Sequence, residues 1–183
     1  PAGHVDVTLN LANERADISG QIKDINAGPL SGGVLEIGAA GPRDDIRFTA
    51  GLTGDTVMAE ITRPVDMAFK GRADLADPVL SISTDISGNI GPYDVLTQTP
   101  LRVSHGEGGF SGEGNLSIFG GYMAYKIDES GTALKIDADD LTLASILALA
   151  GRPGVDGDAG FEAVISGWDT SPSIAVNAKL ENI

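Results

Sequence analysis

Side chains that could take part in catalysis are few in this sequence. It contains two histidines, His4 and His105, and no cysteine. A serine hydrolase would need a histidine beside a serine on a sharp strand-to-helix turn, and no such motif is present. His105 falls in a glycine-rich stretch, so we interpret it as a solvated turn residue. We therefore predict that the chain is not an enzyme and has no catalytic residues.

The acidic clusters are the next candidates, because carboxylates are good ligands for calcium. Asp137, Asp139 and Asp140 lie close together in sequence, and Asp156 and Asp158 flank a glycine. Their spacing does not match the calcium-binding loop of EF-hand proteins with its terminal glutamate. We expect these carboxylates to be solvated. The sequence also contains no phosphate-binding loop or dinucleotide-binding motif, so we predict neither a metal ion nor a cofactor.

The composition favours a β-protein and excludes one class of partner. There are 26 acidic residues against 12 basic ones, a net charge of −14, and the field of such a protein repels nucleic acid. Hydrophobic residues make up 42% of the chain, aromatic residues only 5%, and there are 25 glycines. An aliphatic, glycine-rich sequence is typical of many strands joined by turns. No stretch is apolar enough to span a membrane as a helix.

Apolar and polar residues alternate along most of the chain, as in strands with one buried face. The pattern predicts roughly a dozen strands at the regular spacing of all-β proteins. Turns are expected at residues 53–55, in a glycine-rich region over 106–114 and at 128–131, and a loop is expected over 26–33. Between two of these regions, only a short strand is expected, around residues 101–103.

One segment has the spacing of a helix instead. The residues that recur at i, i+3, i+4 and i+7 are Leu143, Ile146, Leu147 and Ala150. Gly151 can adopt the left-handed conformation that ends a helix, and Pro153 cannot continue one. A helix over 143–150 is far shorter than the ~20 apolar residues that a membrane span needs. We predict that it packs into one end of a structure made of strands, beside the strand that begins at Phe161.

We predict a single all-β unit over residues 1–183, and a long sheet curled on itself, with one continuous hydrophobic inner face, fits the uniform alternation at least as well as a sandwich does. A β-sandwich would show the same alternation, but its core usually contains large aromatic residues, and Trp168 instead follows a glycine near a turn. The residues that the alternation assigns to the interior are Val7, Leu9, Leu11, Ile18, Ile22, Ile46, Phe48, Leu52, Val57, Ile61, Val65, Met67, Phe69, Leu80, Ile82, Leu101, Val103, Leu116, Ile118, Leu134, Ile136, Phe161, Ile165, Ile174 and Val176.

The second half of the chain resembles the TamB family of AsmA-like envelope proteins of Gram-negative bacteria. The residues that carry the resemblance are 100–103 (PLRV), 108–118 (GGFSGEGNLSI), Gly120-Gly121, 138–150 (ADDLTLASILALA), and 160–167 (GFEAVISG) followed by Ser171-Pro172. The resemblance implies a long, open and curled β-sheet with a hydrophobic interior, a groove sometimes called a β-taco. It implies a location in the periplasm as well, with an inner-membrane anchor on the full-length protein. It also implies a TamA-like outer-membrane barrel of the Omp85 type as partner. Because the chain starts at Pro1 without an initiator methionine, we expect it to be a fragment of such a protein.

Two functions of different classes follow from the resemblance. In the first, the hydrophobic groove shelters phospholipid acyl chains during transport between the inner and outer membranes and thereby supports outer-membrane biogenesis. Acyl chains need no polar partner along their length, so a continuous aliphatic surface is sufficient to hold them. In the second, the chain is a chaperone-like module for outer-membrane protein or autotransporter assembly and secretion. Its sheet edge would then pair with client strands by β-augmentation.

Overall fold

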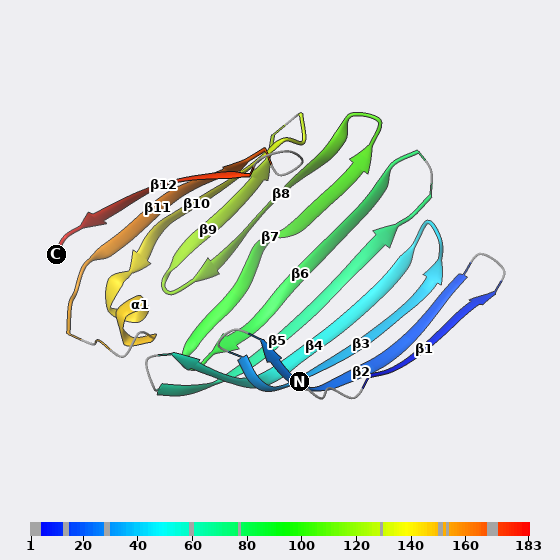
Figure 1. The fold of residues 1–183 in the computed structure, drawn as a ribbon, viewed down its shortest axis with the longest axis horizontal. Coiled ribbons are helices and arrows are strands. Elements are labelled where there is room, and N and C mark those ends of the chain that lie inside the picture. Colours follow the sequence, from blue (N-terminus) through cyan, green and yellow to red (C-terminus); the bar gives the residue numbers. More distant parts are fainter. Residues whose placement is uncertain are drawn as a thin grey trace.

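In the computed structural model, twelve strands form one antiparallel sheet in which each strand pairs with its neighbours in sequence (Figure 1). The structure describes residues 5–12, 15–27, 30–58, 61–76, 78–128, 130–149, 152, 154–167 and 172–183. The strands are β1 (Val5–Ala12), β2 (Arg15–Ala27), β3 (Leu30–Pro42), β4 (Ile46–Met58), β5 (Ile61–Asp74), β6 (Leu80–Ile90), β7 (Tyr93–Gly106), β8 (Gly109–Ile118), β9 (Gly121–Ile127), β10 (Ala133–Thr142), β11 (Asp158–Ser166) and β12 (Ser173–Glu181). One helix, α1 (Leu143–Leu149), follows β10. The predicted all-β open sheet with one short helix is confirmed.

The register of the strands brings the apolar residues of neighbouring strands onto one face. Ile37 of β3 pairs with Ala50 of β4, which pairs with Phe69 of β5, which pairs with Ile86 of β6. Residues that are directly opposite in a ladder project to the same side of the sheet, so these four form a row. We call the side that carries them the inner face.

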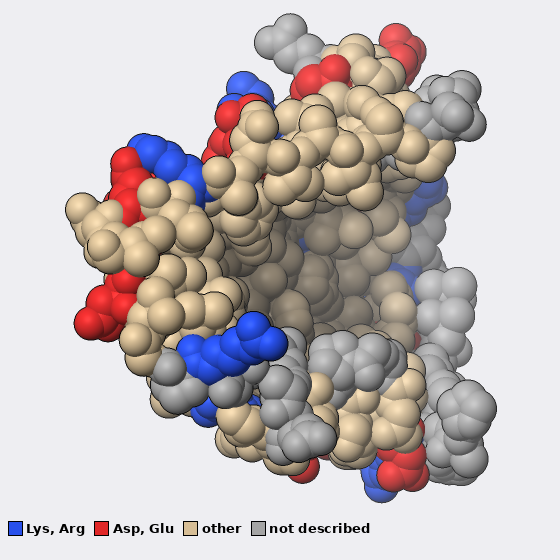
Figure 2. Space-filling model, turned by 60° about the vertical axis from the view of Figure 1, so that its left-hand side comes forward, with Lys and Arg blue, Asp and Glu red and all other residues tan. Residues whose placement is uncertain are grey.

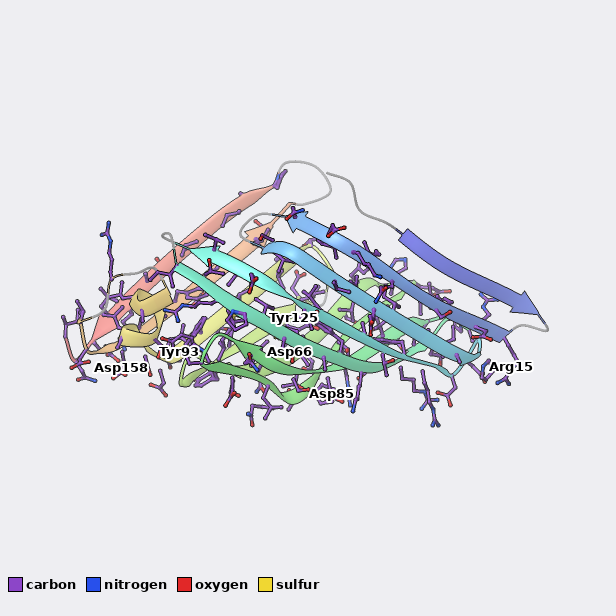
Figure 3. All side chains as sticks on the ribbon, turned by 90° about the horizontal axis from the view of Figure 1, so that it is seen from below. Arg15, Asp66, Asp85, Tyr93, Tyr125 and Asp158 are labelled. Carbon is purple, nitrogen blue, oxygen red and sulfur yellow. The ribbon has the colours of Figure 1, made fainter. Side chains whose placement is uncertain are left out.

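The sheet is curled so that the inner face lines a hollow. The walls of this hollow are mostly uncharged, whereas acidic and basic side chains lie on the outside and at the rim (Figure 2). The sticks in Figure 3 agree, because Tyr125 lies within the curl and Asp85 lies on its outer side. The alternation in the sequence is therefore the alternation between the two sides of one curled sheet.

Little of the sheet is buried as in a closed core. Among the residues described, no side chain is less than 2% exposed. A cluster of buried residues is formed by Ala16, Ile46 and Ala73, with partly buried neighbours around it. A two-layer sandwich buries whole side chains between its sheets. The described residues therefore form an open sheet and not a sandwich.

Several predicted turns are wrong, and each contains glycine. Residues 53–55 continue β4, where Gly54 pairs with Val65 of β5. The glycine-rich region over 106–114 is mostly strand, with a turn only at 107–108. The predicted short strand at 101–103 belongs to β7. In the predicted loop over 26–33, residues 26–27 end β2 and residues 30–33 begin β3, while residues 28 and 29 lie outside the described residues. The predicted turn at 128–131 separates β9 from β10, as expected.

One of these strand glycines lies beneath an aromatic ring from the next strand. Gly114 of β8 is covered by Tyr125 of β9, because an added Cβ at Gly114 would be 3.1 Å from the Tyr125 ring and 2.5 Å from Leu101. The Tyr125 hydroxyl thus reaches across β8 and donates a hydrogen bond to the Arg102 carbonyl at 2.6 Å. Burial raises the pKa of Tyr125. Glycine inside a strand marks such close approaches as well as turns.

The turn between β9 and β10 is held by one carboxylate. Asp128 Oδ1 accepts hydrogen bonds from the backbone N–H groups of Thr132 at 2.7 Å and Ala133 at 2.8 Å, and the Ser130 hydroxyl donates to Oδ2. The hydrogen bonds from Ser130, Ala133 and Thr132 favour the charged form and lower the pKa of Asp128. A single acidic residue thus sets the connection that aligns β9 with β10.

Candidate functional site: an apolar groove

The candidate site is the hollow bounded by the inner face, which we call the groove. Its wall contains apolar rows that run from strand to strand across the ladder. One row, from β6 to β12, consists of Ile82, Val103, Gly112, Ile127, Leu134, Ile165 and Ile174. A second row, from β2 to β8, consists of Ile22, Leu35, Leu52, Met67, Gly88, Val95 and Ile118. The apolar surface is therefore continuous over most of the sheet.

The groove is open to water at some positions and closed at others. In β6 and β7, Ile82 is 46% exposed and Val103 is 38% exposed. Farther along the same strand β7, toward the end of the sheet where α1 lies, Val95 is only 4% exposed. Large apolar side chains that remain exposed together on a concave surface make that surface a candidate binding site.

Helix α1 lies at one end of the sheet, next to β10 (Figure 1). Its first residue, Leu143, is buried, and the Leu143 N–H donates to the Gly157 carbonyl at 2.9 Å. Just before it, the Thr142 N–H donates to the Phe119 carbonyl in the β8–β9 turn at 2.9 Å. The predicted helix over 143–150 is confirmed for residues 143–149. Ala150, like the predicted stop at Gly151 and Pro153, lies outside the described residues.

The other end of α1 is joined to the far wall of the groove by an arginine. Arg63 of β5 occupies an inner-face position, and its Nη2 donates to the Ala148 carbonyl at 2.8 Å. The last carbonyls of a helix have no partner within the helix, so a cationic donor is favourable there. Because β5 and α1 are far apart in sequence, this contact links the two sides of the groove at the α1 end.

We expect a charge at Leu147 of α1 to open this end of the groove and to leave the rest of the sheet unchanged. Replacing Leu147 by aspartate places a charge at a partly buried position of the short helix, and a segment with few contacts opens most readily. Amide hydrogen exchange should become faster in α1 and in β11, with β3 unchanged. Ser145→Asp, which places the same charge on the opposite side of the helix, is the control and should have a smaller effect. Equal loss of protection throughout the chain would mean that α1 is part of one cooperative core.

Most of the residues that the alternation assigned to the interior share the inner face. By register, these are Ile18, Ile22, Ile46, Phe48, Leu52, Ile61, Val65, Met67, Phe69, Leu80, Ile82, Leu101, Val103, Leu116, Ile118, Leu134, Ile136, Phe161, Ile165, Ile174 and Val176. Val7, Leu9 and Leu11 fall on β1, whose side chains lie outside the described part of the structure.

Val57 is the exception among these residues. It pairs with Thr62 of β5 and lies on the outer face, where it is exposed. The physical reason is that β4 runs on without a turn at 53–55, so the alternation continues from Leu52 and carries odd-numbered residues outward. The inner residues at this end of β4 are Gly54 and Thr56. Sequence analysis did not identify Thr56 and its ladder partner Arg63 as inner-face residues, because it assigned only apolar residues to the interior.

The residues considered for chemistry are spread along the sheet and engaged with neighbours. The His105 ring stacks on Phe110 with a centroid distance of 4.5 Å. Asp137 forms an ion pair with Lys135 at 3.1 Å, and the Tyr122 hydroxyl donates to Asp139 at 3.3 Å. Over the described part of the chain, no three histidine or acidic side chains are grouped so that they could hold a metal ion.

The outer face carries a second hollow, of about 780 Å³, over β5 to β9. Its charged lining residues are Arg72, Arg102, Lys126, Asp74 and Glu113, and its lining also includes Ile82, Val103, Gly112 and Ile127 of the first apolar row. Asp45 Oδ1 also lies 2.8 Å from Arg72 Nε, so the cations there are largely matched by carboxylates. This mixture of charges favours no particular ligand class over the apolar groove.

The fold and the groove together define an open, curled antiparallel sheet with an apolar concave face. Comparisons with known protein families, with curated proteins and with solved structures gave no match to this chain. No helix among the described residues is long and apolar enough to cross a membrane.

Proposed function

We propose that the groove shelters the acyl chains of phospholipids and that the chain has no enzymatic role. The observation that supports this most directly is the continuous apolar inner face, parts of which, such as Ile82 and Val103, remain open to water. Each methylene group that leaves water is worth about 0.8 kcal/mol, so a long chain gains several kcal/mol without any specific partner. Because no position along an apolar row is unique, a bound chain can also slide.

The wider setting of this proposal rests on the resemblance to the TamB family. In that setting the chain is one segment of a periplasmic bridge that is anchored in the inner membrane and meets a TamA-like barrel at the outer membrane. Phospholipids would move along the bridge and support outer-membrane biogenesis. The groove supports this setting through its shape and its apolar lining.

Recovery of lipid tests the proposal. Purified protein, stripped of lipid with an apolar resin, is incubated with vesicles of phosphatidylethanolamine and phosphatidylglycerol, re-isolated and extracted for mass spectrometry. We expect phospholipid to be recovered with the protein, and uptake of simple alkyl alcohols to rise with chain length by up to about fourfold per methylene. Absence of lipid, or affinity that does not depend on chain length, would contradict the proposal.

A second candidate function is supported by the edge strand β12. It pairs with β11, and all nine of its residues are exposed, including Ile174 at 68%. An exposed edge of alternating apolar and polar residues can accept a further strand. In this alternative the chain assists assembly of outer-membrane proteins. A photo-crosslinker at Val176 that captures strand peptides, in protein that recovers no lipid, would favour it.

A further inference from the structure

Two polar side chains at the α1 end of the groove have buried atoms without a hydrogen-bond partner. These atoms are Arg63 Nε and Thr56 Oγ1. The two residues are directly opposite each other in the β4–β5 ladder, and Thr56 is only 4% exposed. Both occupy inner-face positions, so the two side chains project from neighbouring positions at one end of an apolar surface.

Unpaired buried polar atoms require an explanation, because most polar groups in protein interiors have a partner. A single one can reflect local strain, but here a cationic N–H donor and a hydroxyl are neighbours. In the described part of the chain, no carboxylate forms an ion pair with Arg63. The pair therefore presents a positive charge and two hydrogen-bonding atoms, which suits a ligand with negatively charged oxygens.

The arginine is held in place for such a role. Its Nη2 is fixed by the Ala148 carbonyl at 2.8 Å, while its buried Nε has no hydrogen-bond partner. The aliphatic part of the side chain packs against Gly91, where an added Cβ would be 3.1 Å from Arg63 Cδ. Beyond Arg63 in the same strand is Val65, which is buried and pairs with Ile90. An apolar surface thus begins directly beside the charge.

We propose that Arg63 and Thr56 bind the oxyanion headgroup, a carboxylate or a phosphate, of an amphiphile whose acyl chain lies on the apolar rows of the groove. This inference rests on the proposed function, because the acyl chain supplies the apolar part of the ligand. It adds a fixed orientation of the bound amphiphile. The headgroup lies at the α1 end, and the acyl chain extends toward the exposed residues Ile82 and Val103.

The test compares ligands that share one apolar chain. Binding of laurate, dodecyl phosphate and neutral dodecanol is measured on the whole chain by calorimetry, with acetate and inorganic phosphate as headgroups without a chain. We expect the two anionic amphiphiles to bind about 10- to 100-fold more tightly than dodecanol, the gain from charge-assisted hydrogen bonds. Acetate and phosphate alone should bind far more weakly than either amphiphile.

The variants assign this preference to the two residues. Arg63→Met should reduce binding of laurate and dodecyl phosphate to the level of dodecanol and leave dodecanol binding unchanged. Thr56→Val retains the contact between Arg63 and α1, so it tests the site even where Arg63→Met disturbs folding. This variant should reduce the preference for the anionic amphiphiles over dodecanol a few-fold. Arg72→Met, on the outer face, is the matched control and should change nothing.

The possible outcomes separate this inference from the proposed function. Equal binding of laurate and dodecanol by the unmodified chain would overturn the headgroup site while the groove stands as an acyl-chain site. A preference that survives in both Arg63→Met and Thr56→Val would also overturn it. Tight binding of free phosphate would show an anion site unrelated to lipid. Failure of every long-chain ligand to bind would contradict the proposed function itself.

Discussion

Replacing Gly71 by valine is expected to lower the free energy of unfolding by about 2–4 kcal/mol. Gly71 of β5 pairs with Phe48 of β4 on the inner face, and the Phe48 ring lies over it. An added Cβ would be 2.3 Å from the Phe48 ring and 2.4 Å from the Ser83 carbonyl oxygen. The ring would have to leave its position and the β5–β6 ladder would have to shift. Urea denaturation, followed by circular dichroism, measures the loss.

Gly51→Val is the matched control for this prediction. Gly51 lies in the adjacent strand β4, and an added Cβ there would have no atom within 4 Å. Because valine is favoured in strands, this variant should be neutral or slightly stabilising. If the two substitutions destabilised the protein equally, the cost would come from losing glycine in a strand and not from the contact with Phe48.

Replacing Ile86 by aspartate is expected to weaken binding of neutral alkyl chains by at least about tenfold, with the sheet still folded. Ile86 of β6 lies in the row with Phe69 and is only partly buried. A carboxylate there stays in contact with water in an open groove, but it removes apolar surface from the wall. Dodecanol binding and the circular dichroism spectrum of the variant give the two required measurements.

The comparison with Ser87→Asp makes this second prediction specific. Ser87 is the next residue, on the outer face, where it pairs with Leu96 and is exposed. The same charge there should affect neither binding nor folding. If Ile86→Asp unfolded the protein while Ser87→Asp did not, Ile86 would belong to a packed core, since an unpaired buried charge is costly. The groove would then have no room for a ligand.

Sequence analysis predicted much of the fold because strand alternation is a local property. The residues of β6 and β12 alternate with a period of two, and the structure places Ile82, Ile174 and their apolar neighbours on one face. The helix was predictable for the same reason, since the spacing of Leu143, Ile146 and Leu147 is set within two turns. Neither inference depends on which strands are neighbours.

The wrong sequence-based predictions concern residues whose structural role depends on a neighbouring strand. Gly54 and Gly114 have the appearance of turn residues in the sequence, but they lie in strands, where residues of neighbouring strands approach them closely. Continuing β4 through Gly54 also moved Val57 to the outer face. No pattern within a single strand distinguishes a glycine that turns the chain from one that accommodates an aromatic ring.

The sequence alone thus determined that the chain forms many half-apolar strands and one short helix, since both periodicities are encoded in consecutive residues. The tertiary structure decided that these strands form one open sheet in sequential order, with the apolar side turned inward. It also decided that Thr56 and Arg63 meet at the α1 end, where Arg63 binds the Ala148 carbonyl across 85 residues. Such contacts depend on ladder register and on the curl of the sheet, which no stretch of sequence contains by itself.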